Sequence, residues 1–234
     1  MFTIVSLPDS CPTDISVGLV PVTIELSPGS ACWQLLSPSE KDRVTRFRNS
    51  SDVARFANIR IALRLLLSQK LSIHPEDVAI ESDSDGWPTL GYPLASYRSY
   101  PNVDFNVSHS GDYGMVAISS LHRVGIDIQQ YDPVLEWWKL APTTLSFSEC
   151  AHIHKLPKEQ QLATFYVCWT AKESLLKCAG IGLRYDLSQI SLPLHMQRIF
   201  TWSMKSMSRL VEYVASPIHV PSGYSAHLAW EQHR

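Results

Sequence analysis

The sequence lacks several features that would assign the protein to a common class. Its five cysteines are odd in number and form no C-x-x-C pair, which argues against a disulfide framework and against a cysteine-based zinc site. The net charge is only −2 and the pI is near 6.5, so no nucleic-acid partner is expected. These properties favour a protein of the reducing cytoplasm.

Long apolar runs are absent as well. The stretch 59–67 is short and is interrupted by Arg60 and Arg64, and residues 1–12 lack the basic start and apolar run of a secretory signal. We therefore expect no membrane partner. With no repeat at a fixed period, the 234 residues are expected to form one large domain or two closely packed lobes.

One segment is rich in positive charge despite the balanced total. Seven basic residues lie within 24 positions that contain two acids, Asp42 and Asp52: Lys41, Arg43, Arg46, Arg48, Arg55, Arg60 and Arg64. Such a local cluster suits an anionic small ligand.

Helix starts are marked by two capping boxes. Ser37 with Glu40 predicts a helix after residue 37, where Pro38 suits the first helical position, and Ser146 with Glu149 predicts another. A further helix is expected near Asp52, with an apolar stripe and with Arg55, Arg60 and Arg64 largely outside it. A last helix ends at Gly180 or Gly182 and buries Phe165, Cys168, Trp169, Leu175, Leu176 and Ala179.

Three short runs in the middle of the chain read as strands: 104–108, 115–119 and 124–128. Alternation in the third run buries its valine and isoleucines and places Asp127 and Gln129 side by side on the other face. The segment 130–144 resembles a loop, and the tail is expected to hold short strands such as 188–192 and 210–214.

Charged residues also mark the last helix. Glu173 and Lys177 lie one turn apart, while Lys172 falls on the apolar stripe, where its charge must reach water or meet an anion. A lysine that extends to solvent beside a surface Glu–Lys pair is the alternative interpretation.

Three motifs in this order resemble those of the Sfp-type 4′-phosphopantetheinyl transferases. Residues 105–110 read F-N-V-S-H-S, residues 124–128 read V-G-I-D-I, and residues 169–174 read W-T-A-K-E-S with Lys177 following. The similarity extends more weakly over positions 35 to 190.

The resemblance implies an α+β fold of two similar lobes related by a pseudo-twofold axis, each with a helix packed on an antiparallel sheet. The lobes would span residues 1–120 and 121–234, with a coenzyme A cleft between them. The implied reaction transfers 4′-phosphopantetheine from coenzyme A to a serine of an acyl or peptidyl carrier protein, releases adenosine 3′,5′-bisphosphate and requires Mg²⁺. A cytoplasmic monomer is expected.

By matched position, the resemblance also implies individual roles. Asp127, Gln129 and Glu173 would form the metal site, Glu173 and Lys177 would be catalytic, and Glu149 is the alternative base. The residues expected at coenzyme A are Arg43, Arg55, Gly86, Trp87, Pro88, Ser108, His109, Lys172 and Lys177. The aromatic segment containing Trp137, Trp138 and Leu140 either meets the carrier protein or belongs to the core.

Two positions depart from the family pattern. Gln129 stands where a second acid is common, and Trp87 stands where a lysine is common. Both changes remove charge, so weaker Mg²⁺ binding and stacking of Trp87 on adenine are expected. The missing acid leaves open a non-catalytic binder of coenzyme A or of a carrier protein, and the acids leave open a metal-dependent phosphohydrolase.

Overall fold

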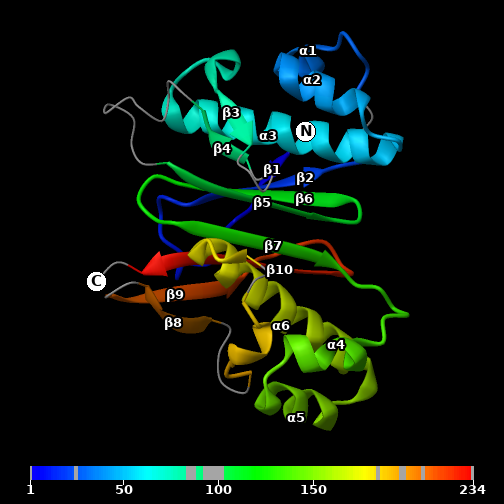
Figure 1. The fold of residues 1–234 in the computed structure, drawn as a ribbon, viewed down its shortest axis with the longest axis vertical. Coiled ribbons are helices and arrows are strands. Elements are labelled where there is room, and N and C mark those ends of the chain that lie inside the picture. The colour runs from blue at the N-terminus through cyan, green and yellow to red at the C-terminus, as the bar shows by residue number, and fades with distance from the viewer. Residues whose placement is uncertain are drawn as a thin grey trace.

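The computed structural model of the protein describes residues 2–23, 26–82, 88–91, 103–182, 185–194, 199–206 and 209–232. Two lobes are stacked along the longest axis, so that the layers run helix, sheet, sheet, helix (Figure 1). All strand pairs within the sheets are antiparallel. The α+β fold of two helix-on-sheet lobes expected from the sequence is confirmed.

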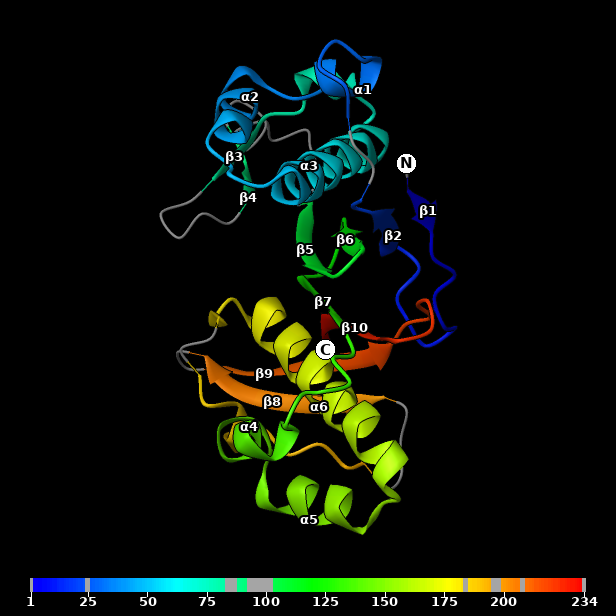
Figure 2. The same cartoon turned by 90° about the vertical axis from the view of Figure 1, so that its right-hand side faces the viewer.

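The N-terminal lobe contains a four-stranded sheet in the order β1-β2-β6-β5. Its strands are β1 (Thr3–Ile4), β2 (Ser16–Pro21), β5 (Asp104–Ser110) and β6 (Tyr113–Ser119). Helix α3 (Ser50–Leu71) covers the face of this sheet that points away from the other lobe (Figure 2). Around it lie α1 (Ala31–Gln34), α2 (Pro38–Thr45), the 3₁₀ helix η1 (Pro75–Asp77) and a small hairpin of β3 (Ile80–Ser82) and β4 (Pro88–Leu90).

The C-terminal lobe contains the second sheet, in the order β7-β10-β9-β8. Its strands are β7 (Val124–Gln130), β8 (Phe200–Ser206), β9 (Arg209–Pro217) and β10 (Tyr224–Gln232). Helix α6 (Lys158–Ala179) packs on its outer face, flanked by α4 (Trp137–Thr144), α5 (Phe147–Lys155) and the 3₁₀ helix η4 (Leu187–Gln189). Gly180 in the left-handed conformation ends α6, as the sequence predicts.

The two lobes share a local design that supports the pseudo-twofold arrangement. Each places a short helix with a capping box, α2 or α5, before a central helix of 22 residues. In each, the glutamate of the capping box forms a buried ion pair with the fifteenth residue of that central helix: Glu40 with Arg64 and Glu149 with Lys172. Both lobes therefore attach the short helix to the central helix by the same kind of buried ion pair.

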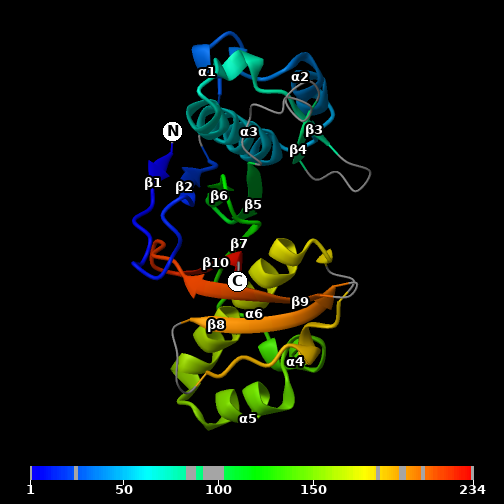
Figure 3. The same ribbon diagram turned by 90° about the vertical axis from the view of Figure 1, so that its left-hand side faces the viewer.

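An apolar core joins the lobes. Val17, Met115 and Ala117 of the N-terminal sheet face Ile126, Ile128 and Leu228 of the C-terminal sheet. The segment between β1 and β2 extends down to the C-terminal lobe and adds Cys11 and Ile15 to this core (Figure 3). The lobes are therefore packed against each other rather than linked by a free hinge.

The structure corrects three expectations from the sequence. Residues 130–144 contain helix α4 rather than only a loop, and residues 188–192 form no strand. Arg60 and Arg64 are buried, 7% and 2% exposed, rather than outside the apolar stripe of α3. The three strands predicted in the middle of the chain are confirmed, and each is longer than expected.

Candidate active site

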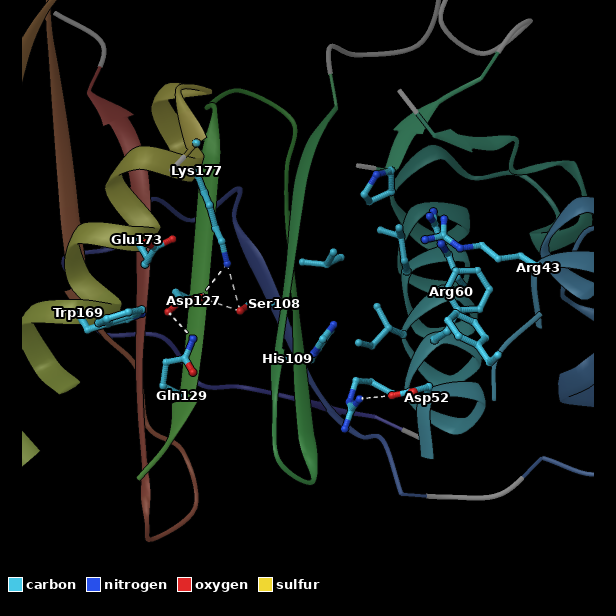
Figure 4. Close-up of a pocket in the computed structure, with 18 residues that line it drawn as sticks. Arg43, Asp52, Arg60, Ser108, His109, Asp127, Gln129, Trp169, Glu173 and Lys177 are labelled. Carbon is cyan, nitrogen blue, oxygen red and sulfur yellow. Dashed lines mark hydrogen bonds and ion pairs between the residues drawn. The ribbon is translucent and has the colours of Figure 1, made fainter. Parts of the chain in front are cut away.

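A cavity of about 590 Å³ lies between the lobes. It has the size of a small-molecule or cofactor site. Its C-terminal wall is formed by side chains of β7 and α6, and its N-terminal wall by side chains of α2, α3 and β5 (Figure 4). The lining residues used below are Arg43, Asp52, Arg55, Phe56, Arg60, Pro88, Ser108, His109, Asp127, Gln129, Trp169, Glu173 and Lys177.

Strand β7 supplies the central carboxylate. Asp127 is 2% exposed and faces α6, since Gly125 and Gln129 share that face while Ile126 and Ile128 enter the core between the lobes. Its Oδ1 accepts hydrogen bonds from the ammonium of Lys177 at 2.7 Å and from the hydroxyl of Ser108 at 2.8 Å. This oxygen is therefore held by one cation and one neutral donor.

Lys177 connects both lobes at this point. Besides Asp127, its Nζ donates to Ser108 Oγ of the N-terminal lobe at 3.2 Å and to the carbonyl oxygen of Ile126 at 3.1 Å. Its side chain retains 12% exposure. One positive charge is thus fixed at the boundary between the lobes, next to the cavity.

Glu173 lies one turn before Lys177 and points into the space between α6 and β7 (Figure 4). It is 8% exposed, and its Oε1 has no hydrogen-bond partner among the described residues. Burial and the neighbouring charge of Asp127 raise the pKa of Glu173 to about 7, while Lys177 opposes the rise. A buried carboxyl oxygen without a partner is costly, which indicates that the site is built to receive a further group.

The chemistry of these donors fits a magnesium ion. Mg²⁺ is bound by oxygen and commonly takes one or two protein carboxylates together with waters and substrate phosphates. Asp127 and Glu173 are two such carboxylates, and the Gln129 amide lies 3.4 Å from Asp127 Oδ2. No cluster of three or more His, Cys, Asp or Glu side chains suited to a metal occurs in the described part of the chain, and waters or substrate phosphates would supply the remaining ligands of such an ion.

The opposite wall is basic and aromatic. The guanidinium groups of Arg43 and Arg60 lie 5.0 and 5.3 Å from the centre of the Phe56 ring. Arg55 pairs with Asp52 at 2.8 Å. Burial lowers the pKa of Arg60 to about 10, which leaves it charged at neutral pH. This wall would attract an anionic ligand.

His109 lies at the open side of the cavity on β5. Burial lowers its pKa, the charges of Arg55 and Lys177 lower it further, and the charge of Asp127 opposes the fall. A bound anion would add a second negative charge near this imidazole.

Comparison with known proteins decides the family. The N-terminal 4′-phosphopantetheinyl transferase family matches residues 27–121, and the 4′-phosphopantetheinyl transferase superfamily matches residues 123–228. The chain belongs to this family. Its members are enzymes that transfer phosphopantetheine from coenzyme A to carrier proteins.

Three relatives illustrate the range of similarity. The Synechocystis sp. protein slr0495 is 33% identical over 174 residues, 74% of this chain and 68% of the relative. The 4′-phosphopantetheinyl transferase HetI of Nostoc sp. is 30% identical over 174 residues, 72% of each chain. The L-aminoadipate-semialdehyde dehydrogenase-phosphopantetheinyl transferase of Mus musculus is 31% identical over 182 residues, 72% of this chain and 58% of the mouse protein.

Lys172, expected at coenzyme A from the phosphopantetheinyl transferase motif, does not reach the cavity. It is 0% exposed, and its ammonium donates to Glu149 Oε2 at 2.5 Å and to the carbonyl oxygens of Thr144 and Leu187 at 2.8 and 3.1 Å. Glu149 is 1% exposed in the same pair, which removes it as an alternative base. Both residues stabilise the core of the C-terminal lobe.

The other residues expected from the family motifs gather at one place. Asp127, Gln129, Glu173, Lys177, Ser108, His109, Arg43, Arg55 and Pro88 all line the cavity. Gly86 and Trp87 lie outside the described residues. Trp137 is buried and Trp138 is 52% exposed, so one of the two tryptophans belongs to the core and the other to the surface.

Sequence reasoning missed several cavity residues, among them Phe56, Arg60 and Trp169. Trp169 lies on the apolar stripe predicted for the last helix, and Phe56 is apolar as well, while hydrophobicity alone does not separate a core wall from a cavity wall. For Arg60, the surplus of positive charge around it was the only available indication.

Proposed function

We propose that this family member transfers the 4′-phosphopantetheine of coenzyme A to a serine of an acyl or peptidyl carrier protein, with Mg²⁺, and releases adenosine 3′,5′-bisphosphate. The observation that carries this proposal is the pair of buried carboxylates, Asp127 and Glu173, beside Lys177 and opposite a basic wall.

The basic wall would bind the anionic end of coenzyme A. Arg43, Arg55 and His109 supply positive charge or N–H donors, and we assign the 3′-phosphate to His109. Ser108 and Lys177, which form a hydrogen bond across the boundary between the lobes, would bind the pyrophosphate. Pro88 would border the nucleotide.

Asp127 and Glu173 would hold Mg²⁺, with Gln129 placed to bind one of its waters. The ion, when bound, supplies positive charge that offsets the charge developing on the pyrophosphate. Lys177 would contribute its charge from the protein side, already oriented by Asp127 and Ser108.

Glu173 is the candidate base for the carrier serine. The serine oxygen would form a bond to the β-phosphorus, and the bond from that phosphorus to the bridging oxygen would break. The serine proton would pass to the Glu173 carboxylate directly or through a water, and adenosine 3′,5′-bisphosphate would leave with the bridging oxygen.

The cellular setting is proposed on similar grounds. The five cysteines are free, which supports a reducing cytoplasm. Both walls of the cavity come from one chain, which supports a monomer as the active form. None of the described helices is both long and apolar enough to cross a membrane.

The direct test is transfer to an apo carrier protein. The protein, coenzyme A and Mg²⁺ are incubated with apo carriers from fatty-acid, polyketide and peptide synthases, and intact mass is measured. We expect one phosphopantetheine added per carrier, and a turnover at least about 10²-fold lower for Glu173→Gln with the fold retained. Binding of coenzyme A without a mass gain would instead identify a binder, and release of free phosphate a phosphohydrolase.

A further inference from the structure

Strands β5 and β7 belong to different sheets, yet they lie side by side across the boundary between the lobes. Four side chains of β5 accept hydrogen bonds from four backbone N–H groups of β7. The pairs are Asp104 with Val124 at 2.7 Å, Asn106 with Ile126 at 3.2 Å, Ser108 with Ile128 at 3.3 Å and Ser110 with Gln130 at 3.0 Å. We call these four hydrogen bonds the seam.

The seam has a constant register. Each acceptor precedes its donor by 20 positions, so the two strands run parallel, and every second residue of each strand takes part. In a continuous sheet, these N–H groups of β7 would donate to carbonyl groups of the neighbouring strand. Here they donate to side chains of β5, so the N–H groups at this edge of the C-terminal sheet are satisfied. The next residues of β5, Phe105 and Val107, point the other way into the core beneath α3.

The seam passes directly through the candidate active site. Ser108 Oγ accepts from the Ile128 N–H and from Lys177, and it donates to Asp127. Its position therefore depends on how β5 is placed along β7. The Ser108 contact to Ile128 is the longest of the four, and its oxygen is shared among three partners, so this serine is poorly suited to fix the register by itself.

Asn106 is the neighbouring inner member of the seam, and among the described residues its side-chain oxygen accepts only from the Ile126 N–H. The geometry points to Asn106 as a positioning residue, whose side-chain carbonyl holds β5 in register with β7 so that Ser108 reaches both Asp127 and Lys177. The effect expected on kcat/KM rests on the proposed function, whereas the effect expected on amide exchange of β7 does not depend on any activity.

Three variants separate positioning from general stability. Asn106→Ala removes the acceptor, and Asn106→Asp keeps an oxygen at the same distance from the backbone. Ser110→Ala is the matched control, because it removes one hydrogen bond of the same seam at its outer end. Backbone amide exchange of β7 is followed by NMR, and kcat/KM for carrier protein and the Kd for coenzyme A are measured on the same samples.

We expect Asn106→Ala to speed exchange at Ile126 and Ile128 and to lower kcat/KM by about tenfold to a hundredfold, since a small misplacement of reacting groups is costly. Asn106→Asp should restore both. Ser110→Ala should speed exchange at Gln130 alone and leave kcat/KM within about twofold. If the loss acts through Ser108, adding Asn106→Ala to Ser108→Ala should change kcat/KM by less than about twofold.

Unchanged amide exchange at Ile126 in Asn106→Ala would show that the Asn106 side chain does not protect this N–H group, and the proposal would fail. Unchanged kcat/KM with faster exchange would overturn the positioning role, as would losses that multiply in the double variant. A wild-type protein that modifies no carrier would count against the proposed function. The exchange rates and the coenzyme A affinity would still show whether Asn106 holds β5 in register with β7.

Discussion

A Cβ atom on Gly125 would lie 2.1 Å from the carbonyl oxygen of Ser174 and 2.4 Å from the backbone nitrogen of Cys178. Strand β7 and helix α6 therefore meet backbone to backbone, which no residue with a side chain would permit. This contact lies between Asp127 on the strand and the turn of α6 that carries Glu173 and Lys177. The glycine thus sets the separation of the two carboxylates.

Gly125→Ala should push α6 away from β7. We expect the free energy of unfolding, measured with urea, to fall by about 1–3 kcal/mol, as for other overpacked sites, and coenzyme A affinity to fall with it. Gly18→Ala is the control, because its Cβ would meet only side-chain ends, Leu66 at 3.0 Å and Phe2 at 3.4 Å. Equal losses for the two variants would show that the close approach to α6 has no special cost.

The same substitution, made separately at Lys172 and at Lys177, distinguishes a lysine of the core from a lysine of the active site. Burial lowers the pKa of Lys172, and Glu149 opposes that change. Lys172→Met leaves Glu149 buried without its cation, so the free energy of unfolding should fall by about 3–5 kcal/mol. Lys177→Met should mainly lower kcat/KM for coenzyme A. The reverse pattern, a stable but inactive Lys172→Met protein, would return Lys172 to the active site.

Features encoded by nearby residues could be predicted from the sequence. Ser37 with Glu40 and Ser146 with Glu149 form the two capping boxes that the spacing predicts. Alternation in residues 124–128 correctly predicts which face of β7 carries Asp127. Helix α4 was missed because Pro142 lies inside it and its first turn has no side-chain cap.

Features that depend on distant partners could not be predicted. The acid that neutralises Arg64 lies 24 residues away, and the acid that neutralises Lys172 lies 23 residues away. Periodicity therefore placed Arg64 wrongly, outside the apolar stripe, and although it placed Lys172 on the stripe, it could not identify Glu149 as the anion that Lys172 meets. The cluster of Asp127, Glu173 and Lys177 was found through motifs, while the seam depends on how two lobes pack and has no local signal.

Asp14 fastens the turn that links the lobes. Its carboxylate accepts hydrogen bonds from Ser119 Oγ at 2.5 Å and from the Leu121 N–H at 3.0 Å, and it pairs with His122 at 2.9 Å. Burial alone would raise the pKa of Asp14, but these three partners outweigh it and lower the pKa below its usual 3.8.

A depressed pKa makes this contribution depend on pH. The folded protein binds the Asp14 proton less readily than the unfolded chain, so the stabilisation is complete above about pH 4 and is lost as pH falls through the lower folded pKa. Asp14→Asn should cost about 1–3 kcal/mol at pH 7, and less as the pH approaches 3. Asp9→Asn, at an exposed aspartate of the same segment, is the control for urea denaturation between pH 3 and 7. A cost for Asp14→Asn that does not change with pH would refute this account.

The adjacent tryptophans of α4 should behave differently. Trp138 is 52% exposed, so Trp138→Ala should raise KM for carrier protein by about fivefold or more and leave KM for coenzyme A unchanged, if the carrier docks there. Trp137 is 4% exposed, and Trp137→Ala should instead lower the free energy of unfolding by about 3–5 kcal/mol. Unchanged carrier kinetics in Trp138→Ala would place the docking surface elsewhere.

Gln129 tests how the proposed metal is held. Its Nε2 lies 3.4 Å from Asp127 Oδ2, so Gln129→Glu would place a third carboxylate beside Asp127 and near Glu173. Without metal, the repulsion among these charges should lower the melting temperature. With metal, the same charge should tighten Mg²⁺ binding by about tenfold, or about 1.4 kcal/mol.

Mg²⁺ binding by Gln129→Glu can be measured through activity and through the melting temperature. The Mg²⁺ concentration for half-maximal activity should fall. The rise in melting temperature at a given Mg²⁺ concentration should grow, since a ligand of the folded state stabilises it more when its Kd is lower. At saturating Mg²⁺ the advantage in turnover should vanish, because the added charge also opposes the anionic transition state. Gln130→Glu is the control, because it adds the same charge one residue along on the other face of β7. If both variants respond to Mg²⁺ as the wild type does, Gln129 lies outside the metal shell, and Asp127, Glu173 and substrate phosphates must hold the ion by themselves.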